Sequence, residues 1–268
     1  MNVYWLEQTE TEVPRENDWL STNEAAFLAA LRFPLRSASW RLGRWTAKHA
    51  VAVCLNLPQS PPQLVKIEVR PAPSGAPEVF FENKPAPLTI SLSHRGGRAI
   101  CAVALDRADL GCDLELIEPR SDRFIADYFA PEEQRLIAHS APASQPLILA
   151  LLWSAKESAL KALHEGLRLD TRSVIVDLLD PSTDVNGWRP FQACYTEGKI
   201  FFGWQQVSDR FVRTVLSAPP SGSPICLNIN RQFSEETLHK PDARGSDEFA
   251  VQKTHGYSHG LPQWPIRF

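Results

Sequence analysis

The chain has 268 residues, of which 43% are hydrophobic and 22% are charged, and its formal net charge is −3. This length is enough to bury a substantial core in one or two domains. The net charge gives no overall positive field that would attract nucleic acid. No apolar run approaches the ~18–20 residues that a membrane-spanning helix needs. We therefore expect a protein that binds neither nucleic acid nor a membrane.

The N-terminal segment lacks a basic stretch followed by a long apolar one, so no secretory signal is predicted. Five cysteines, at positions 54, 101, 112, 194 and 226, are scattered along the chain and form no C-x-x-C pair. Reduced thiols in a cytoplasmic protein are the simplest interpretation, and metal-binding cysteines are not expected.

The first hundred residues carry signals for both helices and strands. A helix over about residues 22–31 is predicted to start with a capping box formed by Ser21 and Glu24. A second helix is predicted to start at a cap formed by Ser37 or Ser39. The strands predicted in this part cover residues 3–6, 65–70, 79–81, 88–93 and 99–105.

One side of the second predicted helix is basic. Arg41, Arg44 and Lys48 lie on it, and Arg36 lies just before it. A solvated helix face is one explanation for this pattern. A phosphate-binding patch is the other, because Arg and Lys offer charged donors to several phosphate oxygens. The spacing alone leaves both explanations open.

A strand predicted over residues 110–117 brings two carboxylates to one face. Successive side chains of a strand alternate between its faces, so Asp113 and Glu115 share one face while Cys112 and Leu114 point the other way, into the core. Taken alone, this pair could also be the outward face of a half-exposed strand.

Residues 145–164 are rich in Leu and Ala and are predicted to form a helix. Trp153, Glu157 and Lys161 are spaced by four and therefore lie on one stripe of that helix. An exposed ion pair between Glu157 and Lys161, worth about 0.2–0.5 kcal/mol, is the alternative to a functional role.

Convergence of the strand and the helix would gather three carboxylates: Asp113, Glu115 and Glu157. Such a cluster repels itself unless a cation lies within it. Oxygen ligands suit Mg²⁺, which proteins usually hold with a few carboxylates, waters and a substrate phosphate. Lys161, one turn beyond Glu157, would then meet that phosphate.

The later part of the chain is predicted to hold a short helix that opens at residues 131–133 and several strands. Those strands cover residues 173–179, 191–196, 200–207 and 211–216. From residue 219 the chain is a tail rich in Pro, Ser, Gly and His. Residues 239–248 are expected to be flexible, and the apolar residues in 225–229 and 261–268 are expected to pack on the body.

Three segments, in this order and at this separation, resemble the 4'-phosphopantetheinyl transferase superfamily, in its larger (Sfp-like) branch. They are GCDLE at residues 111–115, WSAKESALK at residues 153–161, and an upstream strand that ends in Ser93 and His94. The resemblance covers approximately residues 20–218.

This resemblance implies an α+β fold of two similar α+β halves, packed with pseudo-two-fold symmetry and with the active site between them. We place the N-terminal half at residues 1–108 and the C-terminal half at residues 109–218. Residues 219–268 form the partly flexible tail, to which no chemistry is assigned.

The resemblance also implies a transferase of the holo-carrier-protein synthase type, acting as a cytoplasmic monomer. It would move the 4'-phosphopantetheine arm of coenzyme A, its co-substrate, to a serine of an acyl or peptidyl carrier protein. Mg²⁺ would be held by Asp113, Glu115 and Glu157. Catalytic roles would fall to Glu115, Glu157 and Lys161, with Glu115 as the leading candidate for activating the proton transfer.

The residues that the resemblance assigns to coenzyme A come from both predicted halves: Arg36, Arg44, Lys48, Ser93, His94, Asp113 and Lys161. Members of the family often have Gly-Lys-Pro in the loop before the second hairpin strand. Here Ala76 stands in place of that lysine, which removes one phosphate contact.

Two other function classes stay open. One is a different Mg²⁺-dependent phosphoryl or nucleotidyl transferase, although the sequence contains no G-x-x-x-x-G-K-[ST] loop. The other is a non-catalytic relative that binds carrier proteins or coenzyme A. The sequence does not indicate which carrier protein is the partner.

Overall fold

The computed structural model describes residues 1–179, 184 and 186–229, and its helices and sheets confirm the predicted α+β class. The α-helices are α1 (Thr22–Ala30), α2 (Pro34–Cys54), α3 (Pro61–Leu64), α4 (Asp122–Tyr128), α5 (Pro131–His139) and α6 (Gln145–Ala162). The short 3-10 helices are η1 (Glu10–Glu12), η2 (Pro142–Ser144), η3 (Gly166–Arg168) and η4 (Thr171–Ser173). The strands are β1 (Val3–Thr9), β2 (Ile67–Pro71), β3 (Pro77–Phe81), β4 (Lys84–Pro85), β5 (Thr89–Arg95), β6 (Arg98–Ala104), β7 (Asp109–Leu116), β8 (Val174–Leu178), β9 (Trp188–Tyr195), β10 (Ile200–Ser208), β11 (Phe211–Ala218) and β12 (Ile225–Cys226).

The starts of the first two helices differ in how well the sequence predicts them. The capping box of α1 is confirmed, because the Ser21 hydroxyl accepts from the Glu24 N–H at 3.2 Å and the Glu24 carboxylate accepts from the Ser21 N–H at 3.0 Å. The caps predicted for α2 are wrong, since the helix starts at Pro34, ahead of Ser37 and Ser39. Proline suits a first helical position, where the backbone N–H would have no partner in any case.

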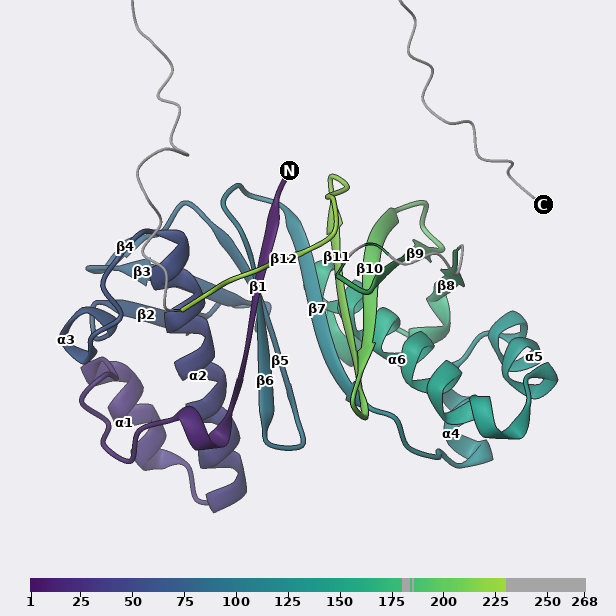
Figure 1. Ribbon diagram of the computed structural model, residues 1–268, viewed down its shortest axis with the longest axis horizontal. Helices are drawn as coiled ribbons and strands as arrows, with labels where there is room; N and C mark the ends of the chain where they lie inside the picture. Colours follow the sequence, from purple (N-terminus) through teal and green to yellow (C-terminus); the bar gives the residue numbers. More distant parts are fainter. Residues whose placement is uncertain (180–183, 185, 230–268) are drawn as a thin grey trace, which may run out of the picture. The chain divides into compact units, whose positions relative to one another are not determined.

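Two sheets form the centre of the fold, and a small third sheet lies beside them (Figure 1). The first has the strand order β12-β1-β6-β5, the second β7-β11-β10-β9-β8, and the third β2-β3-β4. In the described residues, neighbouring strands pair antiparallel except for β1 and β12, which pair parallel.

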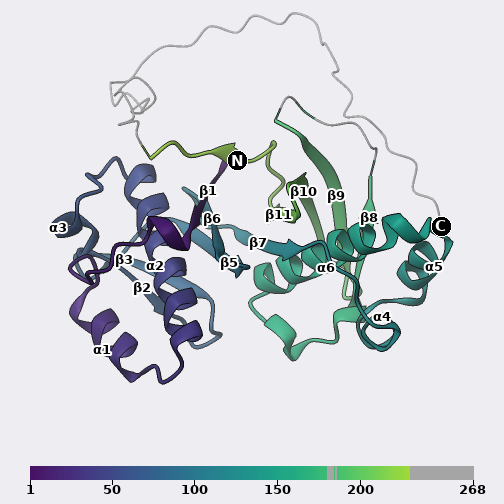
Figure 2. The same ribbon diagram turned by 60° about the horizontal axis from the view of Figure 1, so that its bottom comes forward.

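Alternation along β6 explains how the two large sheets are layered. Cys101 and Val103 face α2 and belong to the core beneath it. Ile100 and Ala102 point the other way and pack in a second cluster with Cys112 of β7. Helix α6 packs on the far face of the second sheet in a third cluster. The two helices therefore flank the paired sheets, as both views show (Figures 1 and 2).

The two sheets meet along β5 and β7. Backbone hydrogen bonds do not pair these strands, but the Ser91 hydroxyl accepts from the Cys112 N–H at 2.9 Å. The Cys112 thiol in turn donates to the Ser91 carbonyl oxygen, with 3.1 Å between Sγ and O. This seam brings the end of β5, with its Ser93 and His94, beside the acidic strand.

A buried ion pair holds helix α1 against α2 and β2. The ammonium of Lys48 lies 2.5 Å from the Glu24 carboxylate, and the Lys48 side chain has no exposed surface. Glu24 also accepts from the N–H of Ser21 at the start of α1 and from the N–H of Val69 in β2, at 3.0 and 3.2 Å. One carboxylate thus connects two helices and a strand.

The same arrangement recurs in the second half of the chain. The ammonium of Lys156 on α6 lies 2.7 Å from the Glu133 carboxylate, and both side chains are buried. Glu133 accepts from the N–H of Ala130 at the start of α5 and from the N–H of Val176 in β8, at 2.8 and 3.0 Å. This likeness agrees with two similar halves, while their pseudo-two-fold relation and the boundary at residue 109 stay predictions.

The first part of the predicted tail packs on the body, as expected. Strand β12 lies beside β1, and the Leu227 N–H donates to the Trp5 carbonyl oxygen at 2.8 Å. Segments 239–248 and 261–268 lie outside the described residues. Within the part of the chain that the structure covers, no helix combines the length and the apolar character needed to cross a membrane.

Gly111 allows α6 to lie directly on β7. A Cβ atom at this position would be 1.8 Å from the backbone oxygen of Ser158 and 3.2 Å from the Ala162 nitrogen. Backbone atoms cannot move aside as a flexible side chain can, so only glycine permits this contact. The glycine of the GCDLE segment is therefore required by packing.

We predict that Gly111→Ala destabilises the protein by about 3 kcal/mol or more, because overpacking a filled site displaces α6. The matched control is Gly43→Ala in the interior of α2, where nothing lies within 4 Å of an added Cβ. This control should gain up to about 1 kcal/mol from helix propensity. Urea denaturation of both variants measures the difference, and equal stabilities would contradict the packing argument.

Candidate functional site

Asp113 occupies the centre of the site. Its side chain is buried, and its Oδ1 atom accepts hydrogen bonds from the Ser93 hydroxyl and the Lys161 ammonium, both at 2.7 Å. Its Oδ2 atom is also buried and has no hydrogen-bond partner in the described residues. The alternative of a half-exposed outer strand face therefore does not apply to Asp113.

Lys161 joins α6 to β7. Its ammonium donates to Asp113 Oδ1 and, at 3.0 Å, to the Cys112 carbonyl oxygen. Desolvation lowers the pKa of Lys161, but the Asp113 charge and hydrogen bond outweigh it, so the pKa is raised and the side chain stays charged. The exposed Glu157–Lys161 ion pair considered above is not formed, because Lys161 reaches across to the strand.

Glu157 faces the same region from α6 but is differently placed. Its side chain is half-buried, and in the residues that the structure describes it makes no hydrogen bond or ion pair. Burial, and then the Asp113 charge, raise the pKa of Glu157 to about 7, although Lys161 acts in the opposite direction. Its carboxyl group is therefore poised to exchange a proton near neutral pH.

Glu115 lies at the outer end of the acidic strand and has cationic partners. Its Oε2 atom accepts from Arg120 at 3.0 Å and from its neighbour's N–H, on Leu116, at 3.2 Å, while Arg95 Nε lies 3.8 Å away. Burial and the Asp113 charge raise the pKa of Glu115, and the two arginines oppose this shift.

The donor set fits a hard divalent cation in its chemistry but is not assembled around one. Asp113 Oδ2 is buried without a partner, Glu157 is unpaired, and all three groups offer the oxygen ligands that Mg²⁺ prefers. However, no group of three or more His, Cys, Asp or Glu side chains among the described residues is arranged to hold a metal ion. The Mg²⁺ site therefore stays a prediction.

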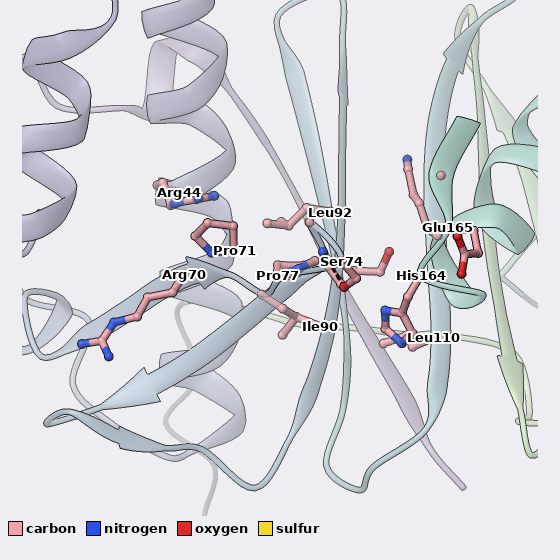
Figure 3. A pocket seen from close by; sticks show the side chains of 15 residues that line it. Arg44, Arg70, Pro71, Ser74, Pro77, Ile90, Leu92, Leu110, His164 and Glu165 are labelled. Carbon is pink, nitrogen blue, oxygen red and sulfur yellow. Dashed lines mark hydrogen bonds between the residues drawn. The ribbon is translucent and has the colours of Figure 1, made fainter. Parts of the chain in front are cut away.

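A cavity of about 370 Å³ opens beside this site, between residues from the two halves of the chain (Figure 3). Arg44 extends into it towards Leu92, and the loop with Ser74 and Ala76 forms one wall. Lys161 of α6 also lines it. Arg44 and Lys161 thus bring a cation from each half of the chain to the cavity, which suits an anionic ligand.

Arg44 is the member of the predicted basic patch that reaches the cavity. Its guanidinium lies 4.9 Å from the centre of the Trp40 ring and 3.9 Å from Glu24. Desolvation lowers the pKa of Arg44, although the Glu24 charge opposes this shift, and an arginine side chain stays charged in proteins. Its buried Nε atom has no hydrogen-bond partner in the described residues. A bound anion would supply acceptors for this guanidinium.

Ser93 and His94 stand at the end of β5, where the seam with β7 places them beside Lys161. Ser93 donates to Asp113, as described above. The His94 side chain is exposed. Desolvation of the ring, together with the Lys161 charge, lowers the pKa of His94. His94 is therefore neutral near pH 7 and can donate or accept a hydrogen bond.

The structure does not bring Lys48 and Arg36 to this cavity. Lys48 donates to the carbonyl oxygens of Trp19 and Leu64, at 2.9 and 3.1 Å, besides its ion pair with Glu24. Its ammonium is thereby saturated in the core, so it holds the N-terminal half together instead of contacting a ligand. Arg36 is exposed near the start of α2 and does not line the cavity.

Two cavity residues, Arg70 and His164, were not predicted from the sequence. The guanidinium of Arg70 is bound to Glu68 at 2.7 Å and to Asn83 at 2.8 Å, and Figure 3 shows it pointing away from Leu92. His164 lies two residues past the end of α6 and has a left-handed backbone conformation, with φ at 58°. The sequence offers one signal for His164: it is a titratable residue that comes three positions after Lys161.

We predict that Lys156→Ala destabilises the protein, although Lys156 is the sequence neighbour of the site residue Glu157. Removing one partner of a buried ion pair leaves Glu133 uncompensated and costs about 3–5 kcal/mol. The control is Lys199→Ala, which breaks a half-exposed pair with Asp109 at 2.7 Å and should cost less than about 1 kcal/mol. Guanidinium denaturation measures both, and a Lys156→Ala loss as small as the control's would contradict the assignment.

The raised pKa of Glu157 also predicts a pH-dependent stability. The folded state holds this proton more tightly than the unfolded state, so the wild type loses stability as pH rises from about 4.5 to 7. Glu157→Gln removes this titration. The free energy of unfolding of the variant should therefore rise relative to that of the wild type by about 1–3 kcal/mol across this pH window, and the difference should stay constant at higher pH. The measurement is the free energy of unfolding between pH 4.5 and 8 without divalent metal. Glu132→Gln, on the exposed side of α5, is the control, and parallel curves for wild type and Glu157→Gln would refute the shift.

Comparison with known proteins agrees with the motifs. The sequence model of the 4'-phosphopantetheinyl transferase superfamily matches residues 109–211, which run from β7 through α6 to the start of β11. The 4'-phosphopantetheinyl transferase HetI of Nostoc sp. (strain PCC 7120) is 27% identical over 164 residues, which are 60% of this chain and 67% of HetI.

Two further relatives match shorter segments. A putative 4'-phosphopantetheinyl transferase of Synechocystis sp. (strain PCC 6803) is 26% identical over 126 residues, covering 44% of this chain and 50% of the relative. A 4'-phosphopantetheinyl transferase of Bacillus subtilis is 33% identical over 90 residues, covering 34% of this chain and 39% of the relative. The chain thus aligns with half or less of these two relatives, and the matches do not specify a branch. They confirm the resemblance predicted from the sequence: residues 109–211, which carry β7 and α6, are similar to the 4'-phosphopantetheinyl transferase superfamily.

Proposed function

We propose that this protein is a Mg²⁺-dependent 4'-phosphopantetheinyl transferase that uses coenzyme A to modify a serine of an acyl or peptidyl carrier protein. Assignment to the larger (Sfp-like) branch, a monomeric state and a cytoplasmic location are part of the same proposal. The named activities of the relatives support it, and the geometry of the site supplies a physical basis.

One observation carries the proposal. The buried carboxylate of Asp113 is bound by Ser93 from the first half of the chain and by Lys161 from the second, both at 2.7 Å. The cavity beside these residues is lined by Arg44 as well as by Lys161. A ligand with two separated anionic groups, such as the pyrophosphate and the 3'-phosphate of coenzyme A, suits this distribution of cations.

In the proposed complex, Arg44 binds the remote phosphate of coenzyme A, while Ser93, His94 and Lys161 bind the pyrophosphate. Lys161 suits this role because it is charged and part of its side chain is exposed, at 27%. Asp113, Glu115 and Glu157 would hold Mg²⁺, which when bound neutralises charge that develops on the pyrophosphate.

The reaction then requires one bond to form and one to break. The carrier serine oxygen bonds to the phosphorus that carries the pantetheine arm, the pyrophosphate P–O bond breaks, and adenosine 3',5'-bisphosphate leaves. The serine proton passes to a carboxylate of the site, either Glu115 or Glu157. Glu115 is the candidate that the sequence favours, and Glu157 has no hydrogen-bond or ion-pair partner among the described residues.

The proposal predicts that an apo carrier protein, incubated with this protein, coenzyme A and Mg²⁺, gains the mass of one phosphopantetheine group. Asp113→Ala and Glu157→Ala should each reduce the initial rate by at least about 100-fold, because each loses a charge that acts in the transition state. Chelation of divalent metal should abolish the reaction. Intact-protein mass spectrometry measures all of these rates.

The control variant is Glu132→Ala, which removes a helix glutamate that is 59% exposed and should leave the rate unchanged. Modification that survives both site substitutions would refute the assigned residues. Binding of coenzyme A without modification of fatty-acid, polyketide or peptide carriers would favour a non-catalytic relative. Transfer from ATP in place of coenzyme A would favour a different phosphotransferase.

A further inference from the structure

Four charged side chains form a continuous network where β7 ends. Arg120 lies 3.0 Å from the Glu115 carboxylate and 3.2 Å from that of Glu118. Arg95 lies 2.7 Å from Glu118 and 3.8 Å from Glu115. Two arginines and two glutamates alternate in it, so the network is electrically balanced.

The network is fixed at both ends. Arg95 follows Ser93 and His94 at the end of β5, so it moves with the strand that carries two proposed ligand-binding residues. Arg120 lies with its guanidinium 5.2 Å from the centre of the Phe124 ring. Phe124 in turn packs edge-on against Trp153, on the helix that carries Glu157. Arg120 is thus held against α4 and α6 as well as β7.

The two oxygens of Glu115 have different surroundings. Oε2 takes every hydrogen bond that Glu115 makes in the described residues, from Arg120 and from the Leu116 N–H. Oε1 has no such partner, and 13% of the side chain is exposed. The network therefore anchors one oxygen and leaves the other available.

We infer that Arg120 is a positioning residue, which holds Glu115 by Oε2 so that Oε1 is presented to the divalent cation of the site. This inference rests on the proposed function, because it concerns the cation that the reaction requires. Carboxylates that bind metals are commonly oriented by hydrogen bonds from outside the coordination sphere, and loss of such a partner typically weakens metal binding by 10–100-fold. Without Arg120, Oε2 would keep only the Leu116 N–H as a hydrogen-bond donor among the described residues, and Oε1 would be held less firmly.

The test is a direct titration of the whole protein with Mn²⁺, monitored by electron paramagnetic resonance of the free ion. Arg120→Ala should weaken Mn²⁺ binding by about tenfold or more. Arg120→Lys, which restores a donor, should recover part of this loss. Arg123→Ala is the matched control and should bind Mn²⁺ as the wild type does. Arg123 is 90% exposed and, among the described residues, pairs only with Asp127 in the next turn of α4.

A double variant separates positioning from a general loss of charge. If Arg120 acts through Glu115, Arg120→Ala should cost little further Mn²⁺ affinity in a Glu115→Gln background. Additive losses would overturn the inference, as would wild-type affinity in Arg120→Ala. Thermal melting checks that each variant is folded, and Arg120→Gln serves if Arg120→Ala is not. Failure of the wild type itself to bind Mn²⁺ would instead remove the metal site of the proposed function.

Discussion

The close contact of α6 with β7 at Gly111 is the constraint on which the site depends. The Ser158 backbone oxygen occupies the space that a Cβ atom would need, and the hydroxyls of Ser154 and Ser158 bond to Thr214 at 2.8 and 2.7 Å. Because the side chains at this contact are small and their hydroxyl groups are hydrogen-bonded, the helix can lie directly on the sheet. Only at this separation does Lys161 reach both Asp113 and the backbone of β7.

Two neighbouring residues of α6 show how one motif serves packing and chemistry together. Lys156 and Glu157 are about 100° apart around the helix, so they face different surroundings. Lys156 points into the core and completes an ion pair with Glu133, as Lys48 does with Glu24. Such pairs add little net stability but are costly to break, which fixes the rotation of each helix. That rotation is what directs Glu157 towards β7.

Local periodicity predicted the elements of the site, but long-range partners decided the role of each residue. The strand alternation that places Asp113 and Glu115 on one face and the four-residue spacing of Glu157 and Lys161 are properties of neighbours in sequence. The burial of Lys48, in contrast, depends on carbonyl groups at Trp19 and Leu64, which no spacing rule connects to it. The Arg120 network likewise joins separate turns of the chain, and the orientation of Arg70 depends on Glu68 and Asn83.

The balance of charge explains why Glu157 differs from the other carboxylates. Four carboxylates lie here. Asp113 is paired with Lys161, and Glu115 and Glu118 are paired with Arg95 and Arg120. Among these four carboxylates, Glu157 is the one without an ion pair in the described residues, and its raised pKa follows from burial beside Asp113. A proton or a divalent cation can supply the missing positive charge, but only the cation also attracts a pyrophosphate. Competition between the two would tie occupancy of the site to pH as well as to the concentration of metal.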